Sequence, residues 1–154
     1  MSHPKALVLD RPNDALYAIA RDTNDVYVIS LSAYTTIQRI GVGRSPYGAD
    51  LINGVLYVAN FDDGTVSRID VATRTRLLPD IYIGREPTWV AADLATGKVY
   101  VVTHRENGVA VLWGGSIWRI VGAGRGAFAV AVDGPGRRVY VGNRFSNNVH
   151  VIDG

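Results

Sequence analysis

The sequence predicts an all-β protein, and three observations support that fold class. Short runs of alternating apolar and polar residues follow one another along the whole chain, at the period of a β-strand, and no window keeps the period of a helix. The turns between these runs contain Gly, Asn or Asp, which tolerate the backbone angles of tight hairpins. Gly makes up 17 of the 154 residues and charged residues make up 19%, which is typical of one turn-rich globular domain.

One pattern occurs four times in the chain. Its anchors are four tyrosines that stand 40, 43 and 40 residues apart: Tyr17, Tyr57, Tyr100 and Tyr140. Seven residues before each Tyr is an Asp (Asp10, Asp50, Asp93 and Asp133), and nine residues after each Tyr a second alternating run begins. A period of about 40 residues indicates a repeat protein in which each copy is one structural unit.

The pattern within each copy predicts up to four short antiparallel strands. The first is rich in Ala, Gly and Val, as in ALVL, and suits a crowded innermost position; the second contains the anchor Tyr. Between the second and third strands stands a residue that tolerates left-handed angles: Asn24, Gly64, Asn107 or Asn147. A fourth strand follows in three copies and ends in Gly-Arg, at Gly43-Arg44, Gly84-Arg85 and Gly124-Arg125, whereas the last copy stops after its third strand.

Four antiparallel strands repeated at this period predict the blades of a β-propeller. We expect one repeat domain over residues 1–154, with blade units at approximately 3–43, 45–84, 86–124 and 126–154. The fourth blade is expected to lack its outer strand.

Three segments resemble the YVTN family of β-propeller repeats: Gly43-x-x-Pro46-Tyr47-Gly48, LYVANFDDGTVSRIDVATRT and VYVGNRFSNNVHVIDG. The resemblance covers nearly the whole chain and implies the propeller fold. It implies no single activity, because relatives include surface-layer-type binding proteins, propeller domains attached to oxidoreductases and lyase-like propellers. Family members are often extracytoplasmic or on the cell surface, whereas the start of this chain lacks the apolar stretch of a signal peptide, so the compartment stays open.

Four blades are fewer than the seven or so with which this family usually closes its ring. An open stack of four would expose an apolar sheet face at each end, larger than a monomer tolerates. We therefore expect a homodimer of two half-rings that closes an eight-bladed ring about a twofold axis. The alternative is closure of four strongly twisted blades within one chain, and a chain excerpted from a longer propeller is compatible with the dimer.

Three arginines are the first candidate for a binding site. In a propeller, the link into each blade and the turn between its second and third strands lie at the same end, so Arg44, Arg85 and Arg125 should ring one mouth of the channel. Their guanidinium groups suit a carboxylate, a phosphate or an acidic protein partner. The alternative is that they are solvated turn residues, paired weakly with acids such as Glu86.

Aromatic residues are expected at the same mouth. Phe61, His104 and Phe145 fall in the corresponding turn of three successive copies, and aromatic residues together with Arg are typical of recognition surfaces. His104 is also the one acid-base candidate there.

Asp50 has two interpretations. Its copy has 11 residues from Pro46 to Tyr57, where the first and third copies have 13 between the same anchors. If the shortening lies in the Asn53-Gly54 turn, Asp50 belongs to the inner strand and is a channel-lining carboxylate beside Arg44. Otherwise it is a hydrogen-bonded turn residue.

The remaining polar residues of the pattern favour structural roles. Asp10, Asp93 and Asp133 are expected to cap the first hairpin of their blades, and Asn60 and Asn143 to satisfy backbone groups of the next turn.

We expect a non-catalytic binding or assembly scaffold that completes its ring by self-association. The alternative function is a propeller lyase or hydrolase with a dispersed site built from His104 and Asp50. Cys is absent, and His3, His104 and His150 share no metal-ligand spacing, so neither a metal nor another cofactor is expected. The net charge of +2 is spread along the chain and no apolar run is long enough to span a bilayer, which disfavours nucleic acid and membrane as partners.

Overall fold

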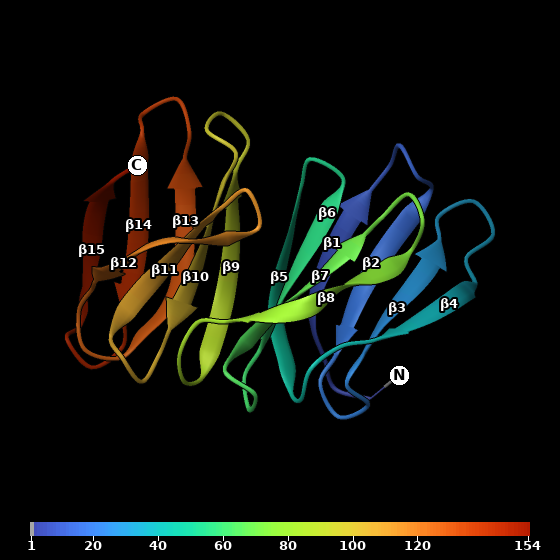
Figure 1. Cartoon of the computed structure of the whole chain (residues 1–154), viewed down its shortest axis with the longest axis horizontal. Coiled ribbons are helices and arrows are strands. Elements are labelled where there is room, and N and C mark those ends of the chain that lie inside the picture. Colours follow the sequence, from blue (N-terminus) through green and yellow to red (C-terminus); the bar gives the residue numbers. More distant parts are fainter. Residues whose placement is uncertain (1) are drawn as a thin grey trace.

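The computed structural model describes residues 2–154 and contains four antiparallel sheets, as expected from the four copies of the pattern (Figure 1). Each sheet is called a blade here, and its strands pair in chain order. Blade 1 contains β1 (Pro4–Asp10), β2 (Ala15–Ala20), β3 (Asp25–Ser30) and β4 (Thr36–Gly41). Blade 2 contains β5 (Pro46–Ile52), β6 (Val55–Asn60), β7 (Thr65–Asp70) and β8 (Thr75–Tyr82). Blade 3 contains β9 (Pro87–Asp93), β10 (Lys98–Thr103), β11 (Gly108–Trp113) and β12 (Ser116–Gly122), and blade 4 contains β13 (Ala127–Asp133), β14 (Arg138–Asn143) and β15 (Asn148–Asp153).

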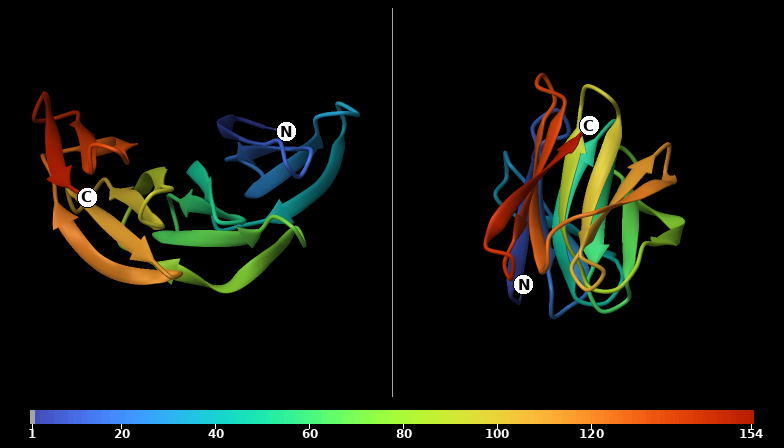
Figure 2. Two further views of the ribbon diagram at one scale, coloured as in Figure 1. Left: turned by 90° about the horizontal axis from the view of Figure 1, so that it is seen from above. Right: turned by 90° about the vertical axis from the view of Figure 1, so that its left-hand side faces the viewer.

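The blades stand side by side in an open arc (Figure 2). The inner strands β1, β5, β9 and β13 lie along the concave side and are neighbours in that order, and the outer strands β4, β8 and β12 lie on the convex side. Blade 1 and blade 4 form the two ends of the arc. The alternative of a four-bladed ring closed within one chain is therefore wrong for this structure, because blade 1 and blade 4 lie apart at opposite ends of the arc (Figure 2).

The hydrophobic core lies between the blades. Three separate apolar clusters fill the junctions between blades 1 and 2, 2 and 3, and 3 and 4. The anchor tyrosines Tyr17, Tyr57 and Tyr100 each fill one of these junctions and are buried, and burial raises the pKa of their hydroxyl groups. Each blade thus has two apolar faces and depends on a neighbour for each.

The turns follow the residues that sequence analysis singled out. Asn24, Gly64, Asn107 and Asn147 have positive φ values of 55, 69, 51 and 51°. The carboxylates of Asp10, Asp93 and Asp133 accept hydrogen bonds from the backbone N–H groups of Asn13, Ala95 and Gly136, so these three residues do cap their hairpins.

The expectation for the two asparagines needs correction. Asn60 donates to the side chains of Thr65 and Ser67, both at 2.9 Å, and not to the backbone of the next turn. Asn143 donates to the Asn148 side chain and to the carbonyl of Val141 in its own strand. Both amides are buried at the end of their strand and find partners in their own blade.

Gly48 allows the inner strands to approach one another closely. A Cβ atom at this position would lie 2.5 Å from the carbonyl oxygen of Thr88 and 2.8 Å from the Cα atom of Trp89, in the next blade. Within residues 2–154, no helix is long and apolar enough to cross a membrane.

Candidate functional site

The links between blades and the turns between second and third strands lie at the same end of every blade, and we call the side of the arc that they form the link face. Backbone hydrogen bonds join each turn to the link of its own blade: Phe61 N–H to the Ser45 carbonyl at 3.1 Å, His104 N–H to Glu86 at 3.1 Å and Arg144 N–H to Gly126 at 2.9 Å. The predicted placement of the rim arginines and the loop aromatics on a single face is therefore correct.

Two of the three rim arginines are paired with acids on that face. Arg44 donates its backbone N–H to Asp63 Oδ2 at 2.7 Å and its Nε–H to Asp63 Oδ1 at 2.5 Å. These bonds, that from the backbone N–H first, hold the pKa of the Asp63 carboxyl below its usual range, and Asp63 raises the pKa of Arg44. Arg85 donates its backbone N–H to Glu106 at 3.0 Å, and its Nε lies 3.8 Å from the same carboxylate.

Glu86 does not pair with a rim arginine: its carboxylate accepts a hydrogen bond from Arg105 Nε at 2.8 Å, and this bond raises the pKa of Arg105. Arg125 differs from the other two rim arginines. Its backbone N–H binds the Ser146 hydroxyl at 2.8 Å, and none of the ion pairs within residues 2–154 includes its guanidinium. The link face is therefore not the uniform ring of three available cations that the sequence predicted.

Aromatic rings form a continuous row across the link face. Phe61 contacts Tyr47, Tyr47 contacts Phe128, Phe128 contacts His104 and His104 contacts Phe145, with ring centroids 5.9 to 6.2 Å apart. These contacts are tilted or edge-to-face, as aromatic pairs prefer. Phe145 is 64% exposed, whereas Phe61 is only partly exposed, so one and not both of the predicted phenylalanines is fully available.

Cations cover three of these rings. Lys5 Nζ lies 5.3 Å from the centroid of Tyr47, the guanidinium of Arg21 lies 5.7 Å from Phe61 and that of Arg144 lies 4.9 Å from Phe128. Sequence analysis missed Tyr47, Phe128 and these three cations. The signal that could have found Tyr47 and Phe128 is their shared position, second in the inner strand of their blades, directly after Pro46 and Ala127.

His104 is fixed by its neighbour in blade 4. Its Nδ1 lies 2.7 Å from the carbonyl oxygen of Ala127. A carbonyl oxygen only accepts, so Nδ1 of His104 donates in this contact.

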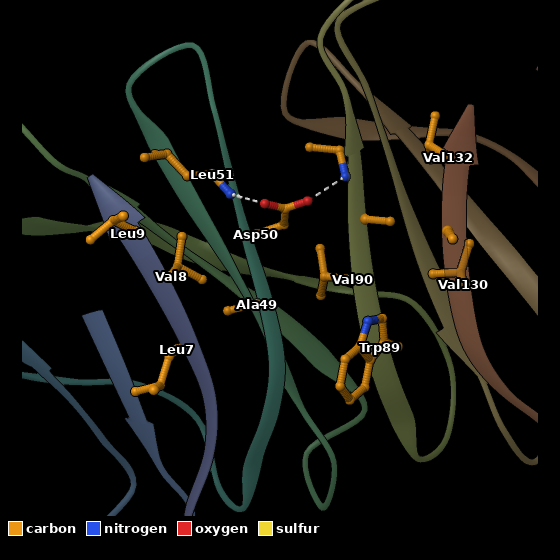
Figure 3. A pocket seen from close by; sticks show the side chains of 13 residues that line it. Leu7, Val8, Leu9, Ala49, Asp50, Leu51, Trp89, Val90, Val130 and Val132 are labelled. Carbon is orange, nitrogen blue, oxygen red and sulfur yellow. Dashed lines mark hydrogen bonds between the residues drawn. The ribbon is translucent and has the colours of Figure 1, made fainter. Parts of the chain in front are cut away.

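Asp50 lies in the inner strand of blade 2. It pairs with Tyr57, as Val8 pairs with Tyr17 in blade 1, and the shortened turn is Asn53-Gly54, which joins Ile52 directly to Val55. The first of its two interpretations is thus correct as to position, but Asp50 does not contact Arg44. Its carboxylate accepts the N–H groups of Leu51 and of Ala92 in blade 3, both at 2.8 Å (Figure 3).

Asp50 therefore holds two inner strands together. It borders a space of about 550 Å³ on the concave side of the arc, whose walls are otherwise apolar side chains and strand backbone. Figure 3 shows the carboxylate reaching across from β5 to β9, and Trp89 on β9 borders the same space. The other inner strands have Val8, Ala91 or Ala131 at this position and make no such bond.

The structure does not assemble the predicted catalytic pair. His104 is bound at the link face to Ala127, Asp50 is bound between inner strands, and no hydrogen bond joins them. His3 pairs with Asp22 and His150 is exposed on β15. Among residues 2–154, no group of three or more His, Asp or Glu side chains is arranged to hold a metal ion.

Comparisons with known proteins bear on the fold. No family model matches the chain, and no curated protein matches it. Among solved structures, the chain is similar to hydrazine synthase of Kuenenia stuttgartiensis, with a TM-score of 0.88 over 97% of this chain and 17% sequence identity. The chain spans 46% of the length of that protein. At this level of identity the likeness shows the fold alone: an all-β arc of propeller-like antiparallel blades.

Proposed function

We propose that the chain is a non-catalytic binding and assembly scaffold built from YVTN-like repeats, and that a second copy completes its arc to an eight-bladed ring. The observation that carries this proposal is a matched pair of apolar faces at the two ends of the arc. Each end presents the residue types that are buried at the three internal junctions.

Blade 1 presents the first of these faces. Leu9, Leu16 and Ile29 pair across β1, β2 and β3 in the register in which Leu51, Leu56 and Ile69 pair across β5, β6 and β7. In blade 2 this row packs on blade 1, where Leu56 and Ile69 are fully buried. In blade 1 the same row has no preceding blade, and Leu9 is 49% exposed.

Blade 4 presents the second face. Tyr140 pairs with Val151 and Gly142 with Val149, as Tyr17 pairs with Val28 and Ile19 with Val26 in blade 1. Val26 and Val28 are fully buried against blade 2, whereas Val149 and Val151 are 60% and 50% exposed. Contiguous apolar surface of this kind is typical of an interface rather than of a monomer surface.

A polar contact supports the same junction. Asn24 Oδ1 accepts the N–H of Ser45 at 2.8 Å, and Asn107 Oδ1 accepts the N–H of Gly126 at 2.7 Å, each across a junction between blades. Asn147 has the position and positive φ of these asparagines, and His3 has the position and positive φ of Ser45 and Gly126. A second copy seated on blade 4 would bring its His3 N–H to Asn147.

The two end faces of the arc are different and complementary, and this sets the symmetry of the proposed assembly. The face of blade 4 matches the face of blade 1, so two copies form the same head-to-tail junction twice, and a twofold axis closes the ring with no face left open. Two arcs of four blades give eight, within the usual range for propellers.

The test is the molar mass in solution, measured by light scattering behind a sizing column over a dilution series. We expect a species at twice the chain mass of 16.7 kDa that dissociates on dilution. Val151→Asp should shift it to monomer, because a charge would be buried at both junctions. Leu78→Asp is the matched control: Leu78 is exposed on β8, in the middle of the arc, and its replacement should leave the dimer intact. A wild-type monomer at every concentration would overturn the proposal.

A further inference from the structure

The turn of blade 4 on the link face differs from the other three in charge. The corresponding turns are RDTN at 21–24, FDDG at 61–64, HREN at 104–107 and RFSN at 144–147. The first three contain one or two acids, and the turn of blade 4 contains none. The face is therefore locally cationic at one end of the arc.

Arg125 shows the consequence. At each of the two equivalent links, a carboxylate accepts the backbone N–H of the rim arginine and also pairs with its guanidinium. This carboxylate is Asp63 for Arg44 and Glu106 for Arg85. In blade 4 that acid is replaced by Ser146, whose hydroxyl accepts only the backbone N–H. The guanidinium of Arg125 is exposed and lacks the carboxylate that its counterparts have.

Arg144 adds a second cation, on the turn that binds the Arg125 link. The N–H groups of Phe145 and Ser146 both bind the Arg125 carbonyl, at 3.1 and 3.2 Å, so the turn that carries Arg144 lies on the Arg125 link. Arg144 stacks on Phe128, and no hydrogen bond within residues 2–154 uses its guanidinium N–H groups. A guanidinium stacked on a ring keeps the donors along its edge for an anion.

An aromatic platform lies next to these cations. Phe145 is 64% exposed, and a Cβ atom on Gly126 would lie 2.5 Å from its ring. The ring therefore packs directly on the backbone of Gly126, and any larger residue at this position would clash with it. The other links have His3, Ser45 or Glu86 at the position of Gly126. Phe145 and Gly126 thus fit each other.

All three phenylalanines of the chain, Phe61, Phe128 and Phe145, lie in the aromatic row of this face, and the buried core between the blades contains none. His104 packs against Phe145, and its Nδ1 is held by the carbonyl oxygen of Ala127. Apolar rings placed at a surface next to cations without acids are the composition of a recognition site.

We propose that this site, formed by Phe145, Arg125 and Arg144, binds a small organic carboxylate that carries a planar ring. The ring stacks on the open face of Phe145, and the carboxylate takes the place that Asp63 and Glu106 occupy at the equivalent links. The site lies within one chain and does not require ring closure. In the turn of blade 1, the Asp22 carboxylate is already bound by Ser2 and His3 of its own chain.

The test is a calorimetric titration of the full chain with naphthalene-2-carboxylate at low salt. Two matched probes separate the contributions: naphthalene-2-carboxamide keeps the ring without the charge, and cyclohexanecarboxylate keeps the charge without the planar ring. We expect each to bind about tenfold more weakly, the loss of one charged contact or of one stacked ring. Equal binding of the carboxylate and either analogue would overturn the proposal.

The decisive variant is Ser146→Asp, which restores the acid of the other blades and should pair with Arg125. We expect it to weaken naphthalene-2-carboxylate binding about tenfold, as should Phe145→Leu. Phe145 is exposed and Ser146 is partly exposed, so folding should be retained, which circular dichroism checks. Arg11→Gln, an exposed arginine in the β1–β2 turn at the other end of the blades, is the matched control and should leave binding unchanged. Full binding by Ser146→Asp would show that the ligand does not occupy the place of that acid; the mass measurement tests ring closure separately.

Discussion

Replacing Asp50 with Ala should weaken the junction between blades 2 and 3. The carboxylate accepts the Ala92 N–H across the junction, and its loss leaves that amide on an inner-strand edge that faces the concave space. Removing one partner of such a bond costs about 1–3 kcal/mol. The bond to Leu51 joins adjacent residues and Asp50 is partly exposed, so we expect a loss toward the lower end of this range, about 1–2 kcal/mol of the free energy of unfolding. For a chain of this size that lowers Tm by roughly 2–8 °C.

The assay is urea unfolding followed by tryptophan fluorescence at pH 7, at one fixed protein concentration because self-association would add to apparent stability. Asp50→Asn keeps a single carbonyl oxygen as acceptor and should fall between wild type and Asp50→Ala. Asp153→Ala removes an exposed carboxylate that makes no side-chain hydrogen bond within residues 2–154, and it should change stability by less than about 0.5 kcal/mol. An Asp50→Ala protein with the urea midpoint of wild type would refute the role of Asp50 in joining the blades.

Three further outcomes are expected. The pKa of Asp63 is lowered in the folded chain, so its contribution to stability should be present above the unfolded pKa of about 3.9 and be lost as pH falls through the folded pKa. The difference in free energy of unfolding between wild type and Asp63→Asn, measured between pH 2 and 7, should therefore vanish at the acid end. Gly48→Ala places a methyl group 2.5 Å from a backbone carbonyl of blade 3, and calorimetry should show a loss of about 2 kcal/mol or more, with an unchanged Tm contradicting the close approach. Tyr17→Ala should cost about 3–5 kcal/mol in unfolding experiments because it empties a filled junction, whereas Tyr140→Ala should cost a dilute monomer much less; equal losses would contradict the difference in burial.

Much of the fold could be predicted from the sequence because the signals are local. Alternation at a period of two, left-handed residues in the turns and a Tyr every 40 or so residues each act within one blade. For Asp50, counting residues between Pro46 and Tyr57 left two positions open, and the strand pairing decided that the turn had lost the two residues.

The partners of charged side chains could not be predicted in the same way. Glu106 pairs with Arg85, and Glu86 pairs with Arg105, although Glu86 is adjacent to Arg85 in sequence. The backbone of the link turns at Glu86, which has a φ of 54°, and the ion pairs instead join residues 19 and 21 positions apart, where a turn folds over the link. The aromatic row depends on the same effect, because Tyr47 and Phe128 come from inner strands two blades apart.

The sequence by itself determined the unit, its strands and the number of blades, because β-pairing within a hairpin needs only nearby residues. Tertiary structure decided how the blades stack: as an open arc with apolar ends, with the acid of Asp50 used between blades and the cations Arg125 and Arg144 left without acids. The reason is that junctions between blades are packed by side chains from different repeats, whose angle and contacts no single repeat encodes.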